Sequence, residues 1–233
     1  MKTALVTGGT KGIGKEVVSR LLLIGYEVYC TSRSPSNVGV NPKSVELKLD
    51  ICDADSIDEL SKSLNDDEIN LDLLVLNAGH TEYVELAKTL DDLTPDKFAD
   101  IIQANLLNNY RLLFQLTERL NPGAHVIFVS SIAAFTGIGS NLAYTLSKSC
   151  LKMMASILAK NNLKNIRFNS VAPGLMRTEF TREFPDEYFE LYKSSTPLDR
   201  LAEVTDIADV ILSLETEMIF VNGQTLLVDG GYY

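Results

Sequence analysis

The sequence predicts an α/β fold: a doubly wound, mostly parallel sheet of seven strands with helices on both faces. Two observations predict it. Short apolar runs rich in β-forming residues alternate along the chain with longer stretches in which apolar residues recur at helical spacing. Nearly continuous apolar runs are typical of strands buried on both faces of a parallel sheet. Strand and helix in regular alternation imply right-handed crossovers between parallel strands.

This alternation places each element along the chain. The expected strands are Thr3–Thr7, Glu27–Thr31, Val45–Leu49, Leu71–Leu76, Ala124–Ser130, Ile166–Val171 and Thr225–Val228. The helices expected between them are Ile13–Ile24, Ser56–Asn65, Pro95–Leu120, Ala143–Asn161 and Val204–Leu214. No repeat, low-complexity tract or linker divides the 233 residues, a length that suits one α/β domain. We therefore expect a single domain over residues 1–233.

Composition narrows the classes of partner. The chain has 21 Lys and Arg residues against 31 Asp and Glu residues, a formal net charge of −10. Nucleic acids and anionic membranes would repel such a chain at long range. No apolar run approaches the roughly 20 residues that span a bilayer, and the start of the chain lacks the apolar stretch of a secretory signal. We expect neither nucleic acid nor a membrane as a partner.

The spacing of cysteine and histidine argues against a disulfide framework and against a metal site. Cys30, Cys52 and Cys150 are odd in number and widely spaced, with no CxxC pair. His80 and His125 lie far apart, with no second histidine at ligand spacing. Free thiols are typical of a reducing compartment. We expect a cytoplasmic protein without a metal.

The stretch 178–198 breaks the alternation of strand and helix. It carries many charges, a proline and aromatic residues at positions 180, 184 and 188, which would share one face of a helix. One interpretation is a short helical flap over a ligand site. The alternative is a peripheral hairpin that packs on the core or on a neighbouring subunit.

A glycine-rich segment, TGGTKGIG at residues 7–14, joins the first strand to the first helix. Glycines allow a tight turn and a close approach of backbone to a pyrophosphate. The helix N-terminus presents unpaired N–H groups and a positive dipole end to the phosphates. Between a strand and a helix, this pattern predicts a Rossmann-like, three-layer α/β/α site for a dinucleotide. The alternative is a glycine-rich turn without a ligand.

The end of the second expected strand indicates which dinucleotide is bound. A carboxylate there would bind the adenosine ribose and repel a 2′-phosphate, but residues 31–34 read TSRS, with no acid. Arg33 offers a fixed fork of donors suited to phosphate, Ser32 leaves room and a hydroxyl, and Lys11 could add a second positive charge. We therefore expect NADP(H) to be favoured over NAD(H). The alternative is two solvated surface cations.

A tyrosine and a lysine four residues apart, Tyr144 and Lys148, fall on one face of an expected helix. A free tyrosine has a pKa of about 10, and a nearby ammonium would lower this pKa by stabilising the phenolate. Alone, such a pair is a common surface pattern. Ser131 stands thirteen residues upstream at the end of a buried strand, where its hydroxyl can face the same crevice.

The sequence resembles the short-chain dehydrogenase/reductase family, in its compact single-domain form. The matching pieces occur in the family's order: residues 7–14, Asp50-Ile51, Asn77-Ala78-Gly79, Asn105, Ser131, residues 144–148 (YTLSK), Pro173-Gly174 with Thr178, residues 200–203 (RLAE) and residues 228–231 (VDGG). Jointly they are far more specific than any one motif. A small departure is Leu76, which stands where a second asparagine is frequent.

The resemblance implies four catalytic roles. Tyr144 would protonate the carbonyl oxygen during reduction, and Lys148 would bind the nicotinamide ribose and lower the tyrosine pKa. Ser131 would donate a hydrogen bond to the substrate oxygen, and Asn105 would hold a water that links the lysine to solvent. Hydride transfer itself is chemistry of the cofactor. The alternatives are a strand-end hydroxyl for Ser131 and a buried, helix-kinking amide for Asn105.

The resemblance also implies the cofactor contacts. Asp50 with Ile51 resembles a pair that contacts adenine, although Asp50 could instead cap a helix or a turn. Residues 77–79 resemble the turn beside the adenosine ribose, and Asn77 could also stabilise its strand. Thr178 and the backbone near Met176 would fix the carboxamide. The expected cofactor set is Gly8, Thr10, Lys11, Gly12, Ile13, Gly14, Ser32, Arg33, Asp50, Ile51, Asn77, Ala78, Gly79, Tyr144, Lys148, Pro173, Gly174, Met176 and Thr178.

The leading hypothesis is an NADPH-dependent carbonyl reductase with a partly apolar small-molecule substrate, such as a keto acyl group or a cyclic ketone. An NAD(P)-dependent alcohol dehydrogenase that works in the oxidative direction is the second hypothesis. A nucleotide-binding sensor or scaffold without turnover is the third, and the complete catalytic set argues against it. A substrate on an acidic carrier protein would need a basic patch. Lys160, Lys164 and Arg167 are candidates for it, or else a solvated helix end.

The two longest expected helices carry more apolar surface than one face of a sheet covers. The residues that ring the first of them are Leu106, Leu107, Leu112, Leu113, Phe114 and Leu116. Pairing of helices across a symmetric interface would bury such a surface, and the resemblance implies dimers or tetramers. We expect a homodimer or homotetramer.

Overall fold

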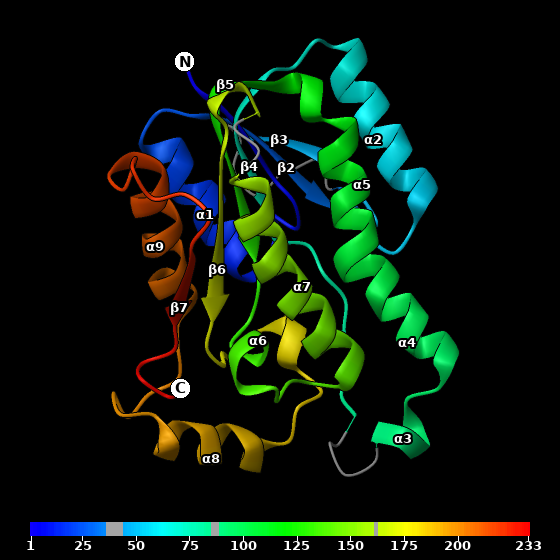
Figure 1. Ribbon diagram of the computed structural model, residues 1–233, viewed down its shortest axis with the longest axis vertical. Coiled ribbons are helices and arrows are strands. Elements are labelled where there is room, and N and C mark those ends of the chain that lie inside the picture. Colours follow the sequence, from blue (N-terminus) through cyan, green and yellow to red (C-terminus); the bar gives the residue numbers. More distant parts are fainter. Residues whose placement is uncertain (36–43, 85–88, 161–162) are drawn as a thin grey trace.

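The computed structural model describes residues 1–35, 44–84, 89–160 and 163–233 (Figure 1). Within them, seven strands pair in parallel in the order β3-β2-β1-β4-β5-β6-β7. The strands are β1 (Thr3–Val6), β2 (Glu27–Ser32), β3 (Ser44–Lys48), β4 (Leu71–Leu76), β5 (Leu120–Val129), β6 (Arg167–Pro173) and β7 (Thr225–Val228). The order runs one way from β1 and the other way from β4, so the predicted doubly wound sheet is confirmed.

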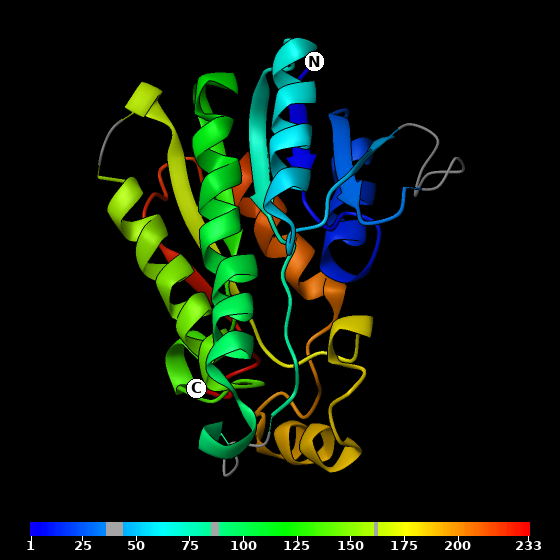
Figure 2. The ribbon, with the colours of Figure 1, turned by 90° about the vertical axis from the view of Figure 1, so that its right-hand side faces the viewer.

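Helices cover both faces of this sheet (Figures 1 and 2). One face carries α1 (Gly12–Leu23) and α9 (Val204–Thr216), which pack against each other. The other carries α2 (Ala54–Asp66), α4 (Pro95–Ile102), α5 (Asn108–Gln115) and α7 (Leu142–Leu158). Short helices α6 (Ala133–Thr136) and α8 (Asp186–Ser195) lie at the end toward which the strands point. The remaining segments are α3 (Thr89–Asp92), η2 (Gln103–Leu107), η3 (Thr117–Arg119), η4 (Leu163–Asn165) and η5 (Glu179–Thr181).

The core forms because successive side chains of each strand point to opposite faces. Ala4 and Val6 of β1 pack under α1 and α9, in a cluster that includes Val17 and Ile211. Leu5 points the other way, into the cluster under α2, α5 and α7. Side chains on both faces of the sheet are buried, which accounts for the continuous apolar runs in the sequence. The sheet thereby fixes all its carboxyl ends along one edge.

One expected helix, Pro95–Leu120, is not continuous. After α4 the chain makes the wide π-type turn η2, continues as α5 and ends in the 3₁₀ turn η3, while Leu120 already belongs to β5. Asparagines explain the break, because their side chains compete for helix carbonyls. The Asn109 amide donates to the carbonyls of Ala104 (3.1 Å) and Asn105 (3.0 Å). Single π turns of this kind are frequent at functional sites.

Other boundaries differ by a few residues. β5 begins at Leu120 rather than Ala124, and α7 ends at Leu158, while Asn161 lies outside the described residues. Among the residues that the structure describes, no helix is long and apolar enough to cross a membrane. In the same residues, no three His, Cys, Asp or Glu side chains gather at metal-binding range. Cys30 is buried, whereas Cys52 and Cys150 are exposed, and all three are free.

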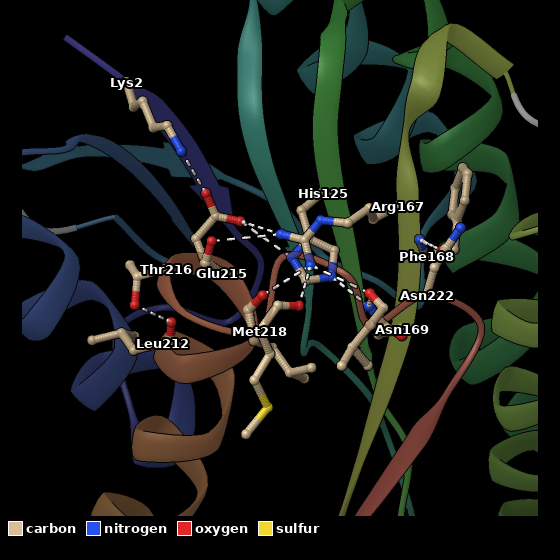
Figure 3. Close-up of polar contacts among 12 residues, drawn as sticks. Lys2, His125, Arg167, Phe168, Asn169, Leu212, Glu215, Thr216, Met218 and Asn222 are labelled. Atoms are coloured by element: carbon tan, nitrogen blue, oxygen red, sulfur yellow. Dashed lines mark hydrogen bonds and ion pairs between the residues drawn. The ribbon is translucent and has the colours of Figure 1, made fainter.

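A buried carboxylate ties the amino ends of the strands together. Glu215 of α9 accepts hydrogen bonds from Lys2 (2.9 Å) and His125 (3.2 Å), and Arg167 approaches to 3.4 Å (Figure 3). The Tyr26 hydroxyl also donates to Glu215, over 2.6 Å. These partners come from the chain's amino end, from the start of β2 and from β5 and β6. Burial alone would raise the pKa of Glu215, but the hydrogen bonds from His125, Tyr26 and Lys2 outweigh it and lower that pKa to about 2.

His125 completes this cluster as a neutral side chain. Asn169 Nδ2 lies 3.0 Å from His125 Nε2 and donates to it, so the proton of the ring stands on Nδ1 and points to Glu215 (Figure 3). Burial lowers the pKa of His125, which favours this neutral form. Asn169 Nδ2 also donates to the carbonyl of Val221 (2.9 Å), which joins β6 to the segment before β7.

Replacing Glu215 with Gln should lower the free energy of unfolding by about 2–4 kcal/mol, because an amide presents a donor to a site built from donors. The pKa of Glu215 in the folded chain lies below its ordinary value of 4.5, and this shift corresponds to a stabilisation of about 3 kcal/mol. The stabilisation is fully present at pH values above 4.5. It is lost as the pH falls toward about 2. Urea unfolding near neutral pH and in mild acid measures both effects.

The control is Glu217→Gln, because Glu217 is exposed at the end of the same helix. We expect its free energy of unfolding to stay within about 0.5 kcal/mol of the parent chain. Equal stability of the Glu215→Gln chain and the parent chain near neutral pH would show that the cluster is not a net source of stability.

Candidate functional site

The glycine-rich turn lies at the carboxyl edge of the sheet and is hydrogen-bonded to the turn that follows β4. Thr7 Oγ1 accepts hydrogen bonds from the backbone N–H groups of Asn77 and Ala78, both at 2.9 Å. The Asn77 amide donates to the carbonyls of Thr7 (2.9 Å) and Gly8 (3.3 Å). The structure therefore brings residues 7–14 and 77–79 together, as expected, and assigns Asn77 a structural bond as well.

The start of α1 fits a pyrophosphate. Lys11 is the residue before the first helical turn, and its side chain makes no capping hydrogen bond. Gly12 has φ of +52°, which favours glycine, and a Cβ built there would meet nothing within 4 Å. Space is therefore open beside Gly12, where the first-turn N–H groups carry the positive end of the helix dipole. Thr10 lies in the same turn, whereas Ile13 packs partly into the core.

The end of β2 is more acidic than the sequence indicated. Ser32 Oγ donates to Glu46 Oε1 of β3 over 2.7 Å. Residues 31–34 contain no acid, but the pairing of β2 with β3 brings one beside them. Arg33 is exposed, whereas Lys11 forms an ion pair with Glu179 at 2.7 Å. Two of the three residues expected near a 2′-phosphate, Ser32 and Lys11, therefore already contact a carboxylate.

Asp50 and Ile51 form the turn after β3. Asp50 Oδ1 accepts from the backbone N–H of Cys52 over 3.0 Å, so the alternative interpretation of Asp50 as a turn residue holds in this structure. The carbonyl of buried Ile51 accepts from the Asn108 amide at 2.7 Å, which ties this turn to α5.

Tyr144 owes its position to a helix cap. Asn141 precedes α7, and its Oδ1 accepts from the Tyr144 N–H over 2.7 Å. The Asn141 amide also donates to the carbonyl of Glu82 at 2.6 Å. The helix that carries Tyr144 is therefore tied to the segment after β4. Asn141 was not among the expected site residues. Asn immediately before the first residue of a helix is nevertheless a recognisable capping signal in a sequence.

Lys148, one turn after Tyr144, is buried with only 4% of its surface exposed. Its Nζ donates to the carbonyl of Val129, the last residue of β5, over 2.8 Å. The same Nζ lies 5.7 Å from the centroid of the Tyr144 ring. Burial lowers the pKa of Lys148 to about 8, because the charged form loses its hydration.

The tyrosine pKa departs from the sequence-based expectation. Burial raises the pKa of Tyr144 to about 12, and a hydrogen bond with Ser131 acts in the opposite direction. The expected lowering by Lys148 is absent in this structure, because the lysine head is bonded to Val129 rather than to the phenol oxygen. Ser131 itself follows β5, and its Oγ accepts from the Ala133 N–H over 3.2 Å.

Asn105 lies in η2 and is completely buried. Its side chain accepts from the His80 N–H (2.8 Å) and donates to the His80 carbonyl (2.7 Å). A Cβ added at Gly79 would lie 2.7 Å from Asn105 Oδ1 and 3.6 Å from Lys148 Nζ, so only glycine fits between them. The structure brings these three residues together, but it commits the Asn105 side chain to backbone rather than leaving it open to water.

The flap region contains η5 and α8 rather than one continuous helix. Phe180 lies in η5, and Pro185 precedes α8, so positions 180, 184 and 188 do not share one helical face. The Phe180 ring lies 6.0 Å from that of Tyr144. Phe184 packs on Tyr83 at 5.0 Å between centroids. Phe180 thus brings an aromatic ring beside Tyr144, and Phe184 connects the flap to the segment after β4.

The remaining expected cofactor residues line the end of β6. Pro173 ends the strand, and the Gly174 N–H donates to the carbonyl of Val228 over 2.8 Å. The Met176 carbonyl accepts from Thr181 Oγ1 at 2.7 Å, and Thr178 precedes η5. These residues connect the sheet edge to the flap.

The candidate basic patch does not assemble. Arg167 turns inward, to Glu215 and to the carbonyl of Leu214 at 2.9 Å. Lys164 pairs with Glu118 at 3.1 Å, and Lys160 is exposed. Two of the three cations are therefore paired with different carboxylates, and the third is exposed.

Comparison with known proteins identifies the family of this chain. A family model described as enoyl-(acyl carrier protein) reductase matches residues 8–233. The chain is 31% identical over 241 residues to the 3-oxoacyl-[acyl-carrier-protein] reductase FabG of Haemophilus influenzae, covering 100% of this chain and 98% of that protein. It resembles a solved short-chain dehydrogenase/reductase of Brucella melitensis, described as a glucose/ribitol dehydrogenase, with a TM-score of 0.89 at 25% identity and coverage of 100% and 96%.

A second solved structure, the Pseudomonas aeruginosa RhlG/NADP active-site complex, has a TM-score of 0.87 at 26% identity and covers 99% of this chain and 96% of its own. The family model spans nearly the whole chain, and the motifs it includes stand together at one edge of the sheet. The chain belongs to the short-chain dehydrogenase/reductase family of oxidoreductases, as the sequence predicted.

Proposed function

We propose that this chain is an NADPH-dependent oxidoreductase that reduces a ketone or aldehyde to an alcohol, with Tyr144 as the proton donor. One observation carries the proposal. Tyr144 and the buried ammonium of Lys148 lie one helical turn apart, at the same edge of the sheet as the glycine-rich turn. The acyl carrier reductase named above supports a carbonyl as the group that is reduced. We also infer one domain and a cytoplasmic location, in keeping with the free thiols.

The cofactor would lie across the carboxyl edge of the sheet. In this arrangement the start of α1 binds the pyrophosphate, Arg33 binds the 2′-phosphate, and residues 77–79 border the adenosine ribose. Gly174, Met176 and Thr178 border the nicotinamide. When bound, NADPH supplies the hydride.

Proton transfer is the task of the chain's own residues. With a pKa of about 12, the Tyr144 phenol is protonated at neutral pH and can deliver its proton to the oxygen of the substrate. Loss of this proton leaves a phenolate, which the hydrogen bond from Ser131 stabilises, since that bond lowers the tyrosine pKa. A lysine pKa of about 8 keeps most molecules charged near pH 7. Ser131 donates a hydrogen bond to the same oxygen, and Asn105 acts by fixing His80 and Gly79 beside the ammonium.

The flap favours a partly apolar substrate. Phe180 borders Tyr144, and the rings of Tyr83, Phe184 and Tyr188 pack together between the flap and the segment after β4. Apolar and aromatic surface at the site binds the body of a ketone rather than a charged molecule. Because the candidate basic patch does not assemble, we favour a free small molecule over one attached to an acidic carrier protein.

Substituting Tyr144 with Phe should lower kcat about 10²–10⁴-fold, because the phenol proton is lost while the ring remains. The measurement is oxidation of NADPH across a panel of keto acyl thioesters, cyclic ketones and aldehydes. NADPH affinity, followed by fluorescence titration, should change little. The control is Tyr110→Phe, since Tyr110 is exposed on α5.

Two results would argue against the reductase. One is full turnover by the Tyr144→Phe chain. The other is no NADPH oxidation by the parent chain on any carbonyl while Tyr144→Phe keeps full biological activity, which would favour a sensor without turnover.

Substituting Lys148 with Met should abolish reduction yet keep or raise the stability of the fold near pH 7. The folded lysine pKa of about 8 lies below the ordinary 10.5, so the folded state binds fewer protons between these values. Stability therefore rises with pH across this window, and below it the buried charge costs about 3 kcal/mol. Met removes that cost and loses the bond to Val129.

Thermal melting of both chains at about pH 7 and about pH 10 checks the sign, because the advantage of Met should shrink at the higher pH. Lys62→Met, at an exposed position of α2, is the matched control and should melt like the parent chain at both values. A Lys148→Met chain that is less stable by the same amount at both pH values would contradict the prediction.

We further propose a homodimer or homotetramer built on η2, α5 and α7. Four of the residues expected at an interface, Leu106, Leu112, Leu113 and Leu116, pack into the chain's own core instead. Exposed apolar side chains remain along one face: Leu107, Tyr110 and Phe114, and beside them Met153 and Ile157 of α7, which contacts η2. Self-association would bury this face.

Phe114, 68% exposed, is the residue to change. Phe114→Glu should convert the assembly to a monomer of 25.7 kDa in multi-angle light scattering, because a charge would be buried at the interface. Leu191→Glu, on exposed α8, should leave the mass of the assembly unchanged. A parent chain that is monomeric at micromolar concentration removes the proposed interface.

A further inference from the structure

Glu46 brings a carboxylate to the end of β2, the strand end from which a dinucleotide's adenosine ribose is bound. β2 and β3 pair in parallel, with Cys30 opposite Glu46 and Ser32 opposite Lys48. Ser32 Oγ donates to Glu46 Oε1 over 2.7 Å. The glutamate side chain therefore extends along the neighbouring strand toward its carboxyl end, although no acid is present in residues 31–34.

This carboxylate shares a face of the sheet with the glycine-rich turn. A Cβ added at Gly9 would lie 2.6 Å from the Cβ of Cys30, so the Cys30 side chain faces the turn. Side chains two residues apart on a strand share a face, which puts Ser32 there too, with Glu46 bonded to it. The carboxylate is thus on the side of the sheet where α1 would receive the pyrophosphate.

Two residues at this strand end act oppositely on one part of the cofactor. Arg33 follows Ser32 directly and is exposed, and a 2′-phosphate would be attracted to its guanidinium. The Glu46 carboxylate would repel the same phosphate. A 2′-hydroxyl, by contrast, can donate a hydrogen bond to the carboxylate or to the Ser32 hydroxyl that the carboxylate orients.

We propose that Glu46, acting through its hydrogen bond with Ser32, is a specificity-determining residue that limits the preference for NADPH and admits NADH. This inference rests on the proposed function, because a nicotinamide dinucleotide is what would bring a ribose to this position. Removing the charge of Glu46 should favour the 2′-phosphate about tenfold, the scale of one charge contact near a protein surface.

Adenosine fragments test the site without turnover. The full chain and its Glu46→Gln variant are titrated by calorimetry with 2′,5′-ADP, which carries the 2′-phosphate, and with 5′-ADP, which does not. Glu46→Gln should bind 2′,5′-ADP about tenfold more tightly and 5′-ADP no more tightly. Glu46→Asp keeps the charge and should keep the parent selectivity to a large extent. Arg33→Gln should lose affinity for 2′,5′-ADP alone.

The control for the change in overall charge is Glu59→Gln, at an exposed position of α2. The proposal is overturned if Glu46→Gln changes both fragment affinities equally or neither, or if Glu59→Gln changes selectivity as much. It is also overturned if the parent chain binds neither fragment. Thermal melting identifies a variant that fails to fold, and Ser32→Ala then serves as a second variant, which should also shift the affinity ratio by releasing the carboxylate from its partner.

Turnover gives an independent reading. The ratio of kcat/KM for NADPH over NADH should rise in Glu46→Gln by the same factor as the fragment affinities. If the fragment selectivity shifts while no carbonyl is reduced by any variant, the proposed reductase activity fails and the assignment of Glu46 stands.

Discussion

The burial of one ammonium group, that of Lys148, sets the arrangement of the candidate site. A charged side chain is stable in such a place only with close polar partners. The carbonyl at the end of β5 supplies one of them, 2.8 Å from the ammonium. Gly79 leaves room beside it, since any Cβ there would also meet the Asn105 amide. The sheet edge, the turn after β4, the π turn and α7 therefore meet around a single cation.

The two ends of the sheet divide stability from chemistry. At the amino ends, the Glu215 carboxylate collects donors from four parts of the chain, and its pKa is low because those bonds outweigh burial. At the carboxyl ends, Lys148 has few partners and its pKa is lowered by burial. The hydrogen-bonded Glu215 carboxylate stabilises the fold, and this offsets the cost of burying the Lys148 ammonium with few partners. The site can therefore keep a titratable lysine without loss of the fold.

Much of the fold and of the motif positions could be predicted from the sequence, because both depend on local signals. Apolar runs mark strands such as Leu71–Leu76, and the expected and observed bounds of that strand agree. The glycine-rich turn and the Tyr144–Lys148 pair are likewise local patterns. The π turn was not predictable, because it depends on which carbonyls the Asn109 side chain reaches after folding. The Ser32–Glu46 and Lys11–Glu179 contacts join residues far apart in the sequence, and no period or spacing reports them.

Those two contacts change how the net charge of −10 should be understood. A negatively charged chain can bind an anionic cofactor where a helix N-terminus and exposed cations concentrate positive potential. Here a carboxylate stands close to each of the two cations. Glu179 forms an ion pair with Lys11, and Glu46 accepts a hydrogen bond from Ser32, the residue before Arg33. A phosphate bound near α1, as proposed, would compete with Glu179 for the Lys11 ammonium, and Glu179 belongs to η5, the start of the flap. Charge at the cofactor site is therefore linked directly to the segment that borders the substrate.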